Sequence, residues 1–230
     1  MLKVANLDVA YGESRIIRGL CFEAKHNETV AIMGRNGMGK TTLMNSLIGI
    51  LKAQAGSIEV DGTDVTKLES HRRVASGLAY VPQGRRIFST LSVEENIQAG
   101  QETASQRRRI GDDIYALFPV LYEMRRRKGG NLSGGQQQQL AIARALVSEP
   151  KVLLLDEPTE GIQPSIIKDI AKVLNQIKQM RELTIVVSEQ VLSFTLEIAD
   201  RVLVMESGQL VHEDTRENVD ESRIAGYLAV

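Results

Sequence analysis

The sequence GRNGMGKT at residues 34–41 constrains the fold more than any other stretch of this 230-residue chain. A short apolar run at 30–33 precedes it, and apolar residues at helical spacing follow it from Thr41 onward. This order predicts a strand, a glycine-rich turn and a helix. In that arrangement the glycines let backbone N–H groups and the helix N-terminus surround a phosphate group. A chance glycine-rich turn is the alternative, and average glycine usage predicts such a match in about one chain in a hundred.

We therefore expect this turn to bind the phosphates of a nucleoside triphosphate. Lys40 can reach the β- and γ-phosphates, and the hydroxyl of Thr41 can ligate Mg²⁺. This motif alone leaves kinases, GTPases, helicases and transport ATPases open. The residues expected to contact the nucleotide in this segment are Gly34, Arg35, Asn36, Gly37, Met38, Gly39, Lys40, Thr41 and Thr42.

A second candidate site segment is KVLLLDEP at residues 151–158, where Asp156 and Glu157 end a fully apolar strand. Ligands of open α/β sheets bind outside the carboxyl ends of such strands. One carboxylate can hold Mg²⁺ and the next can polarise an attacking water. We assign the metal role to Asp156 and the general-base role to Glu157. A solvated strand end before a proline turn is the alternative for this motif taken alone.

Short apolar runs alternate with helical patterns along the rest of the chain. Strands are expected at 30–33, 57–60, 78–81, 152–155, 184–187 and 202–205, and helices at 136–148 and 165–180. This alternation predicts a largely parallel sheet with helices on both faces. The polar stretch 92–146 reads as a helical insertion between two halves of that core.

The composition excludes several classes of partner and compartment. The formal net charge of −1 and the absence of tryptophan give no electrostatic or stacking footprint for nucleic acid. The single cysteine, Cys21, cannot form an internal disulfide, which fits a reducing, cytosolic compartment. The chain shows no secretory signal and no apolar run of the roughly 18 residues that a membrane helix needs. We expect any work at a membrane to be done from outside the bilayer.

The stretch NLSGGQQQQLAIARAL at 131–146 holds two glycines and four glutamines but no carboxylate, histidine or cysteine. Its hydroxyl, amides and backbone N–H groups are suited to holding an anion. Within it, Leu132, Ser133, Gly134, Gly135 and Gln136 resemble the signature motif of ABC-type ATPases. The P-loop, Gln83 in VPQG, the LLLDEP strand and the ADR stretch at 199–201 accompany this motif in the family's order, over essentially the whole chain.

The resemblance implies an α/β fold with a P-loop NTPase (RecA-like) core, a mostly parallel sheet and an antiparallel β portion near the N-terminus. It implies one nucleotide-binding domain over residues 1–230, with the core at about 1–87 and 147–230. A helical subdomain at about 88–146 would touch a permease. The arginines at 85–86 and 107–109 could lie near that contact, but a solvated basic face is the preferred interpretation. Glutamines 137–139 would form an exposed first helical turn.

The resemblance also implies ATP and Mg²⁺ as cofactors and assigns a role to each site residue. In the family the signature contacts the γ-phosphate of ATP held by the partner subunit. Tyr11 lies where an aromatic residue stacks on adenine. The implied catalytic residues are Glu157, Gln190 and Lys40. The implied metal-site residues are Thr41, Gln83 and Asp156.

Two positions depart from the family pattern. Most members carry a histidine where this chain has Gln190, and many carry an aspartate where it has Gln163. Glutamine can donate a hydrogen bond but cannot carry a proton charge, so we expect Gln190 to keep only the positioning role. The Gln163 change puts in doubt any standard account of communication between two ATP sites.

The branch of the family is inferred from resemblance only. Gln190, the compact chain and GRRIF after Gln83 resemble the smaller ATPase subunits of branched-chain amino acid importers and their relatives. Within that set, MGRNGMGKTT, VPQG and NLSGGQQQQLAIARAL look most like the urea importer's subunit. We therefore expect urea as the solute, with branched-chain amino acids as the alternative.

The expected assembly contains a second ATPase subunit of a different chain, two permease subunits and an extracytoplasmic solute-binding protein, with no nucleic acid. This chain would then be cytoplasmic, on the inner face of the cell membrane. The alternatives of a different class are a soluble ABC ATPase of DNA repair or translation, a small-molecule P-loop kinase and a non-catalytic regulatory module. The signature motif argues against the kinase, and intact Lys40, Asp156 and Glu157 argue against the regulatory module.

Overall fold

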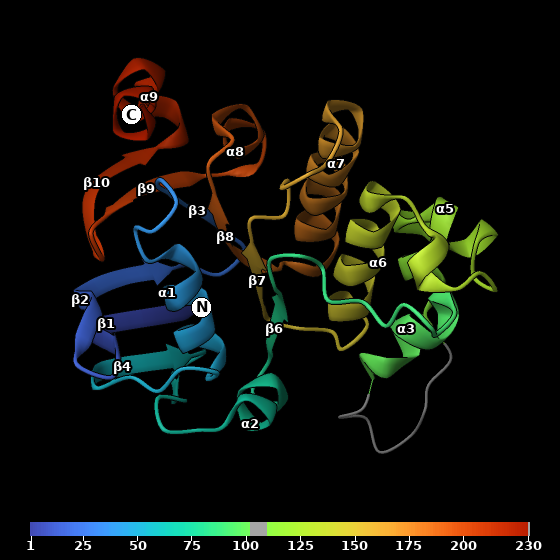
Figure 1. Cartoon of the computed structure of the whole chain (residues 1–230), viewed down its shortest axis with the longest axis horizontal. Coiled ribbons are helices and arrows are strands. Elements are labelled where there is room, and N and C mark those ends of the chain that lie inside the picture. Colours follow the sequence, from blue (N-terminus) through green and yellow to red (C-terminus); the bar gives the residue numbers. More distant parts are fainter. Residues whose placement is uncertain (102–109, 230) are drawn as a thin grey trace.

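The computed structural model describes residues 1–101 and 110–229 of the chain. The arginines at 107–109 lie outside this described part. Within it, the strands form a six-stranded sheet, in the order β10-β9-β3-β8-β7-β6, and a four-stranded sheet, in the order β2-β1-β4-β5. The helices gather around the larger sheet, and α3, α5 and α6 form a lobe at the right of Figure 1.

The larger sheet contains β3 (Thr29–Met33), β6 (Leu78–Val81), β7 (Val152–Asp156), β8 (Thr184–Glu189), β9 (Arg201–Glu206) and β10 (Gln209–Thr215). All neighbouring pairs are parallel except β9 with β10. The expectation of a mostly parallel α/β core is therefore confirmed. Five of the six expected strands lie in this sheet, because strands buried on both faces read as continuous apolar runs.

The smaller sheet contains β1 (Leu2–Tyr11), β2 (Ser14–Ala24), β4 (Ala55–Val60) and β5 (Thr63–Asp64), and all of its pairs are antiparallel. This is the antiparallel portion that was expected near the N-terminus. It lies at the left of Figure 1, beside α1 (Lys40–Ile48).

Side chains that alternate along the central strands divide the core into two clusters. Val30, Ile32 and Leu154 pack with α1 and with the apolar faces of β1, β2 and β4. Ala31 and Leu153 point to the other face, where apolar residues of the later helices cover them. The period of two places successive side chains on opposite faces, so each face of the sheet has its own cover.

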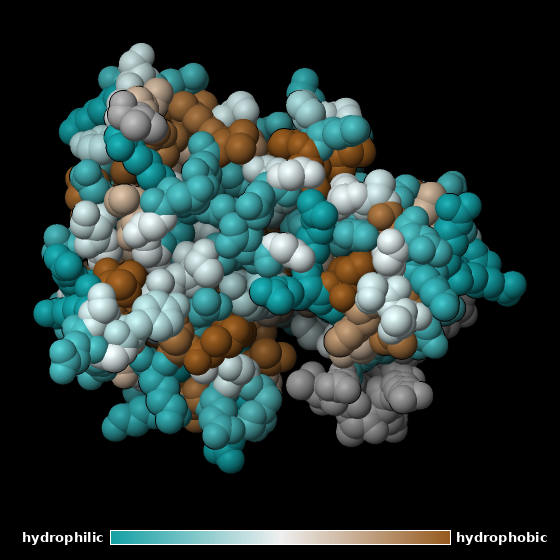
Figure 2. Space-filling view, viewed as in Figure 1, coloured by the Kyte–Doolittle hydropathy of each residue, from teal (hydrophilic) through white to brown (hydrophobic). Residues whose placement is uncertain are grey.

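The remaining elements are helical. The α-helices are α2 (Ser70–Ala75), α3 (Val93–Ala99), α4 (Asp112–Leu117), α5 (Pro119–Glu123), α6 (Gly134–Leu146), α7 (Pro164–Arg181), α8 (Leu192–Ile198) and α9 (Glu221–Leu228). Single 3₁₀ turns lie at Gly129–Asn131 and Arg216–Asn218. No helix of the described residues is long and apolar enough to cross a bilayer. Polar side chains cover most of the face shown in Figure 2.

Helix α6 differs from its sequence-based description in two ways. It begins at Gly134 rather than Gln136, because Ser133 and Gln136 form a reciprocal capping box that satisfies the first N–H groups. Gln138 and Gln139 are buried, so the expectation of an exposed glutamine turn was wrong. The helix packs against α3 and α5 on one side and β6 and α7 on the other, which leaves little of its surface to solvent.

A buried guanidinium joins α1 to α2. Arg73 is 1% exposed, and its fork donates to the carbonyl oxygens of Ser46 and Leu47 in the last turn of α1, at 2.7 and 2.9 Å. It also donates to the carbonyl oxygens of Thr66 and Leu68, at 2.7 and 2.9 Å. Helix ends leave carbonyl groups without internal partners, so Arg73 satisfies the end of the helix that begins in the glycine-rich segment.

We predict that Arg73→Lys lowers the free energy of unfolding by about 2 kcal/mol, because one ammonium group cannot reach carbonyls on all sides and leaves buried acceptors unpaired. Urea unfolding of the purified chain measures this loss. The neighbouring exposed Arg72 provides the control, since Arg72→Lys should cost less than about 0.5 kcal/mol. Equal stability of the two variants would contradict this role for Arg73.

Candidate functional site

The glycine-rich turn lies between β3 and α1, as predicted. Gly37 and Gly39 have φ angles of +83° and +108°, a backbone region that favours glycine. A Cβ on Gly34 would lie 2.5 Å from the carbonyl oxygen of Met205, so the loop can approach β9 only without a side chain there. The loop geometry therefore requires these glycines for physical reasons independent of any ligand.

Two segments near the end of the sequence hold this loop in place. The N–H of Gly208 donates to the carbonyl oxygen of Met38 at 3.0 Å, and the N–H of Ser207 contacts its Sδ at 3.4 Å. From α9, the carbonyl oxygen of Tyr227 accepts a hydrogen bond from Nε of Arg35 at 3.1 Å. The β9–β10 turn and the last helix thus brace the loop from outside.

Three side chains, which follow strands β3, β8 and β6, contact the carboxylate of Glu157. Glu157 itself follows β7 and is 8% exposed. Lys40, after β3, forms an ion pair with its Oε1 at 3.0 Å. Gln190, after β8, donates to Oε1 at 3.0 Å, and Gln83, after β6, donates to Oε2 at 3.2 Å. The structure thus brings together all three residues given catalytic roles, and Gln83 from the set assigned to the metal site.

The ammonium group of Lys40 is buried against the glycine-rich turn that precedes it in the sequence. Its Nζ donates to the carbonyl oxygens of Gly34 and Arg35 at 2.6 and 3.0 Å, in addition to the ion pair. Gln190 reaches the same loop through the Oδ1 of Asn36 at 2.8 Å. Both side chains therefore connect the phosphate-binding loop to Glu157.

Asp156 lies beside Thr41, as expected for two ligands of one metal ion. Its Oδ1 accepts hydrogen bonds from the hydroxyls of Thr41 at 3.3 Å and Ser188 at 2.5 Å, and its Oδ2 accepts one from Tyr80 at 3.3 Å. Burial raises the pKa of the Asp156 carboxyl, although these hydrogen bonds oppose the rise. Burial, followed by the charge of Asp156, also raises the pKa of Tyr80.

These groups fit Mg²⁺. Asp156 is 1% exposed, and none of the ion pairs within residues 1–101 and 110–229 involves it. A hard cation held by oxygen ligands would offset the cost of burying its charge. No group of three or more His, Cys, Asp or Glu suited to a metal occurs in the described part of the chain. Mg²⁺ in nucleotide sites usually needs only one or two carboxylates, together with phosphates and waters.

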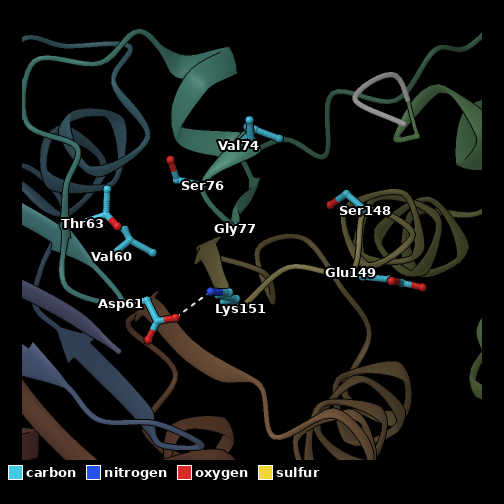
Figure 3. A pocket seen from close by; sticks show the side chains of 10 residues that line it. Val60, Asp61, Thr63, Val74, Ser76, Gly77, Ser148, Glu149 and Lys151 are labelled. Carbon is cyan, nitrogen blue, oxygen red and sulfur yellow. Dashed lines mark hydrogen bonds and ion pairs between the residues drawn. The ribbon is translucent and has the colours of Figure 1, made fainter. Parts of the chain in front are cut away.

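A cleft of about 280 Å³ runs beside these groups and is lined by Ile16, Asn36, Gly37, Gly39, Lys40, Thr41, Thr42, Gln83 and Glu157. Ile16 is the one lining residue that the sequence analysis did not select. A larger cleft of about 510 Å³ lies where β6 and β7 begin, and Figure 3 shows Asp61 and Lys151 paired across it. No predicted site residue lines that larger cleft. The smaller cleft is therefore identified as the functional one by the side chains that line it and not by its volume.

Two predicted parts of the site are separate from this cluster. Residues Leu132–Gln136 lie at the start of α6, and no hydrogen bond or ion pair among the described residues joins them to Lys40, Asp156 or Glu157. The side chain of Tyr11 is 51% exposed at the β1–β2 turn. Neither segment therefore contributes a hydrogen bond or ion pair to the cluster around Glu157 in the described part of this chain.

The sequence analysis missed three residues that shape the site: Tyr80, Ser188 and Glu189. Tyr80 and Ser188 donate to Asp156, as described above. Glu189 is a buried carboxylate at the end of β8 that contacts the loop after Glu157. The only available signal was a run of polar residues, Ser188 to Gln190, directly after an apolar strand.

A P-loop nucleotide hydrolase is the class that this fold and this site define. Residues 17–160 match the ABC transporter family, and the chain belongs to that family as an ATP-binding subunit. The fold also matches the solved cbiO1 of Clostridium perfringens, described as part of the ABC transporter complex cbiONQ, with a TM-score of 0.85 and 28% identity over 97% of this chain and 92% of that chain. The chain is accordingly an ATPase.

Two curated relatives show how far the likeness extends. The chain is 39% identical to the high-affinity branched-chain amino acid transport ATP-binding protein BraG of Pseudomonas aeruginosa, over 94% of this chain and 93% of BraG. It is 33% identical to the lipopolysaccharide export system ATP-binding protein LptB of Haemophilus influenzae, over 99% of this chain and 97% of LptB. Relatives with different transport names thus cover nearly the whole chain at similar identity.

We predict that Asp156→Asn stabilises the nucleotide-free chain at neutral pH. An amide carries no charge to desolvate, keeps an oxygen for Thr41 and Ser188, and presents an NH₂ group to Tyr80. Because burial raises the pKa of Asp156, the native wild type takes up a proton at a higher pH than the unfolded chain does. The gain should therefore be complete at neutral pH and shrink as the pH falls toward about 4.

Urea unfolding at several pH values, without Mg²⁺ or nucleotide, measures this gain. Asp169→Asn on the exposed face of α7 is the control and should leave the unfolding midpoint unchanged. A less stable Asp156→Asn variant at neutral pH would contradict the prediction.

Proposed function

We propose that this chain is the ATP-hydrolysing subunit of a membrane importer for a small polar solute, acting on the inner face of the cell membrane. The observation that supports this most is the convergence of Lys40, Gln83 and Gln190 on Glu157 beside the phosphate-binding loop. Phosphoryl transfer depends mostly on positioning and charge neutralisation, and this cluster offers a cation, a base and two amide donors in mutual contact.

Each of these residues is given a role in the proposed reaction, and Gln83 is given two. Lys40 binds the β- and γ-phosphates, and Glu157 accepts hydrogen bonding from the attacking water and polarises it. Gln190 and Gln83 hold the Glu157 carboxylate and the water in place. Thr41, Asp156 and Gln83 would hold Mg²⁺, which supplies charge neutralisation at the phosphate oxygens. Tyr11 is the proposed contact for the adenine ring.

The start of α6 completes the site of another subunit. Ser133 and the N–H groups of Gly134 and Gly135 lie at a helix N-terminus, where an anion is favoured. We assign this surface to the γ-phosphate of ATP bound to a second ATPase subunit, of a different chain. Closure of the two subunits would then move two permease subunits through contacts of the helical segment 88–146, and hydrolysis would release the closed state.

The solute is the least constrained part of the proposal. The motifs around the P-loop, Gln83 and α6 favour urea, whereas the name of BraG favours branched-chain amino acids. The likeness to LptB, at 33% identity, shows that this degree of similarity spans different transport systems. The proposed site contacts nucleotide and not solute. A soluble ABC ATPase with no role in transport remains the alternative of a different class.

We predict that the tagged chain, purified from gently solubilised membranes of its native host, brings down two permease subunits and a second ATPase subunit. ATP hydrolysis by this complex should rise on addition of solute-binding protein loaded with urea. A rise only with leucine-loaded protein would instead assign the complex to branched-chain amino acids. The Glu157→Gln complex serves as the control, because it should lose at least about a hundredfold in kcat while still binding ATP. Recovery with ribosomes or DNA and without a permease would contradict the importer assignment.

We also predict that wild-type kcat shows no histidine titration near neutral pH, because Gln190 cannot change its charge. In Gln190→His the imidazole contacts Glu157, and kcat should acquire a titration between about pH 6 and 7. The pH profile of kcat in both proteins is the measurement. A steep loss of kcat over this range in the wild type that disappears in Gln190→His would contradict the prediction.

A further inference from the structure

Glu189, the last residue of β8, is a buried carboxylate to which the proposed reaction gives no role. It is 2% exposed. None of the ion pairs in the described part of the chain involves it. A buried carboxylate without a cation is costly unless hydrogen bonds satisfy it, so its surroundings show what it is for.

Four hydrogen bonds converge on this carboxylate from two different segments. Its Oε1 accepts from the backbone N–H of Thr159 at 3.0 Å and from the Thr159 hydroxyl at 2.7 Å. Its Oε2 accepts from the backbone N–H groups of Gln190 at 2.9 Å and Val191 at 3.1 Å. One oxygen thus binds the loop after β7, and the other binds the segment after β8.

These two segments carry the reactive side chains. Thr159 lies two residues after Glu157, and Gln190 directly follows Glu189. Glu157 has a φ angle of +46°, a left-handed conformation that costs a non-glycine residue on the order of 1–3 kcal/mol and persists only where the surroundings enforce it. The N–H of Glu157 donates to the carbonyl oxygen of Ser188 at 3.0 Å. Together with the Thr159 bonds, this fixes the loop against the end of β8 on both sides of Pro158.

An ionised carboxylate accepts all four of these hydrogen bonds. All four groups facing it are donors, and three of them are backbone N–H groups that cannot turn away. A glutamine offers one oxygen and one NH₂ group, so in either orientation its NH₂ would face at least one backbone N–H group. Burial raises the pKa of Glu189, and the four hydrogen bonds oppose that rise.

We propose that Glu189 is a positioning residue for ATP hydrolysis, which fixes Glu157 and Gln190 relative to each other by binding the loops that carry them. This inference rests on the proposed roles of Glu157 and Gln190. Glu189 touches neither nucleotide nor water in this scheme. Its effect should therefore fall on the chemical step and not on ATP binding.

The first test compares Glu189→Gln with wild type in the assembled transporter. We expect kcat to fall by about a hundredfold, since misplacement by about 1 Å can have an effect of that size. The Kd for ATP, measured by equilibrium titration, should change by less than about threefold because the P-loop contacts remain. Glu197→Gln, on the exposed face of α8 in the helix that follows, is the matched control and should leave both values unchanged.

A second pair of variants keeps the test valid if Glu189→Gln does not fold. Thr159→Val removes the hydroxyl donor but keeps the backbone bond, and should lower kcat by about tenfold. Thr159→Ser restores the donor and should return kcat to within about twofold of wild type. In the double variant Glu189→Gln/Thr159→Val, the losses in ln kcat should not add, because both changes break the same contact.

The outcomes separate this inference from the proposed function. Normal kcat in folded Glu189→Gln or Thr159→Val would overturn the positioning role. A fall in kcat matched by an equal loss of ATP affinity would also overturn it, because that pattern indicates a general structural effect. Absence of ATP hydrolysis in the wild-type complex, or full activity in Glu157→Gln, would instead reject the proposed function itself.

Discussion

The ion pair between Lys40 and Glu157 is the interaction on which the site depends. Both side chains are nearly buried, at 4% and 8% exposure, and each charge would be costly in this position without the other. Lys40 follows β3 and Glu157 follows β7, and β8 separates these two strands in the sheet. The pair therefore spans the width of a strand, and Gln190 from the intervening β8 donates to the same carboxylate. Side chains from these strands can meet in this way because the carboxyl ends of parallel strands lie at the same edge of the sheet.

The same edge explains how the chemistry is divided between two adjacent carboxylates. Asp156 is the last residue of β7 and is satisfied by hydroxyl groups alone, whereas Glu157 begins the following loop and is satisfied by an ammonium group and two amides. One step along the backbone, with a left-handed φ at Glu157, turns the two side chains toward different partners. The proposed metal ligand and the proposed base thus lie side by side while their side chains bind different partners.

The sequence predicted the central strands well, because strands covered on both faces leave continuous apolar runs. The resemblance to the family also predicted that Lys40, Gln83, Glu157 and Gln190 act in one site, and the structure brings these four side chains together. The sequence-based predictions were wrong or incomplete where contacts between distant segments determine burial and hydrogen bonding. Gln138 and Gln139 are buried because helices lie on both sides of α6, which no local pattern indicates. Glu189 was missed because its partner Thr159 is 30 residues away in sequence, and the link exists only when β7 and β8 are adjacent.

The phosphate-binding loop is synthesised long before the segments that hold it in place. Residues 34–41 are made early, yet β3, which leads into them, pairs with β8 and β9 from the last quarter of the sequence. The loop itself is held by Ser207, Gly208 and Tyr227. A nascent chain that has emerged only as far as α7 already contains the complete nucleotide motif but lacks both neighbours of its central strand. Because domains fold as units during synthesis, this loop acquires its final contacts only after β8, β9 and the last helix have been made.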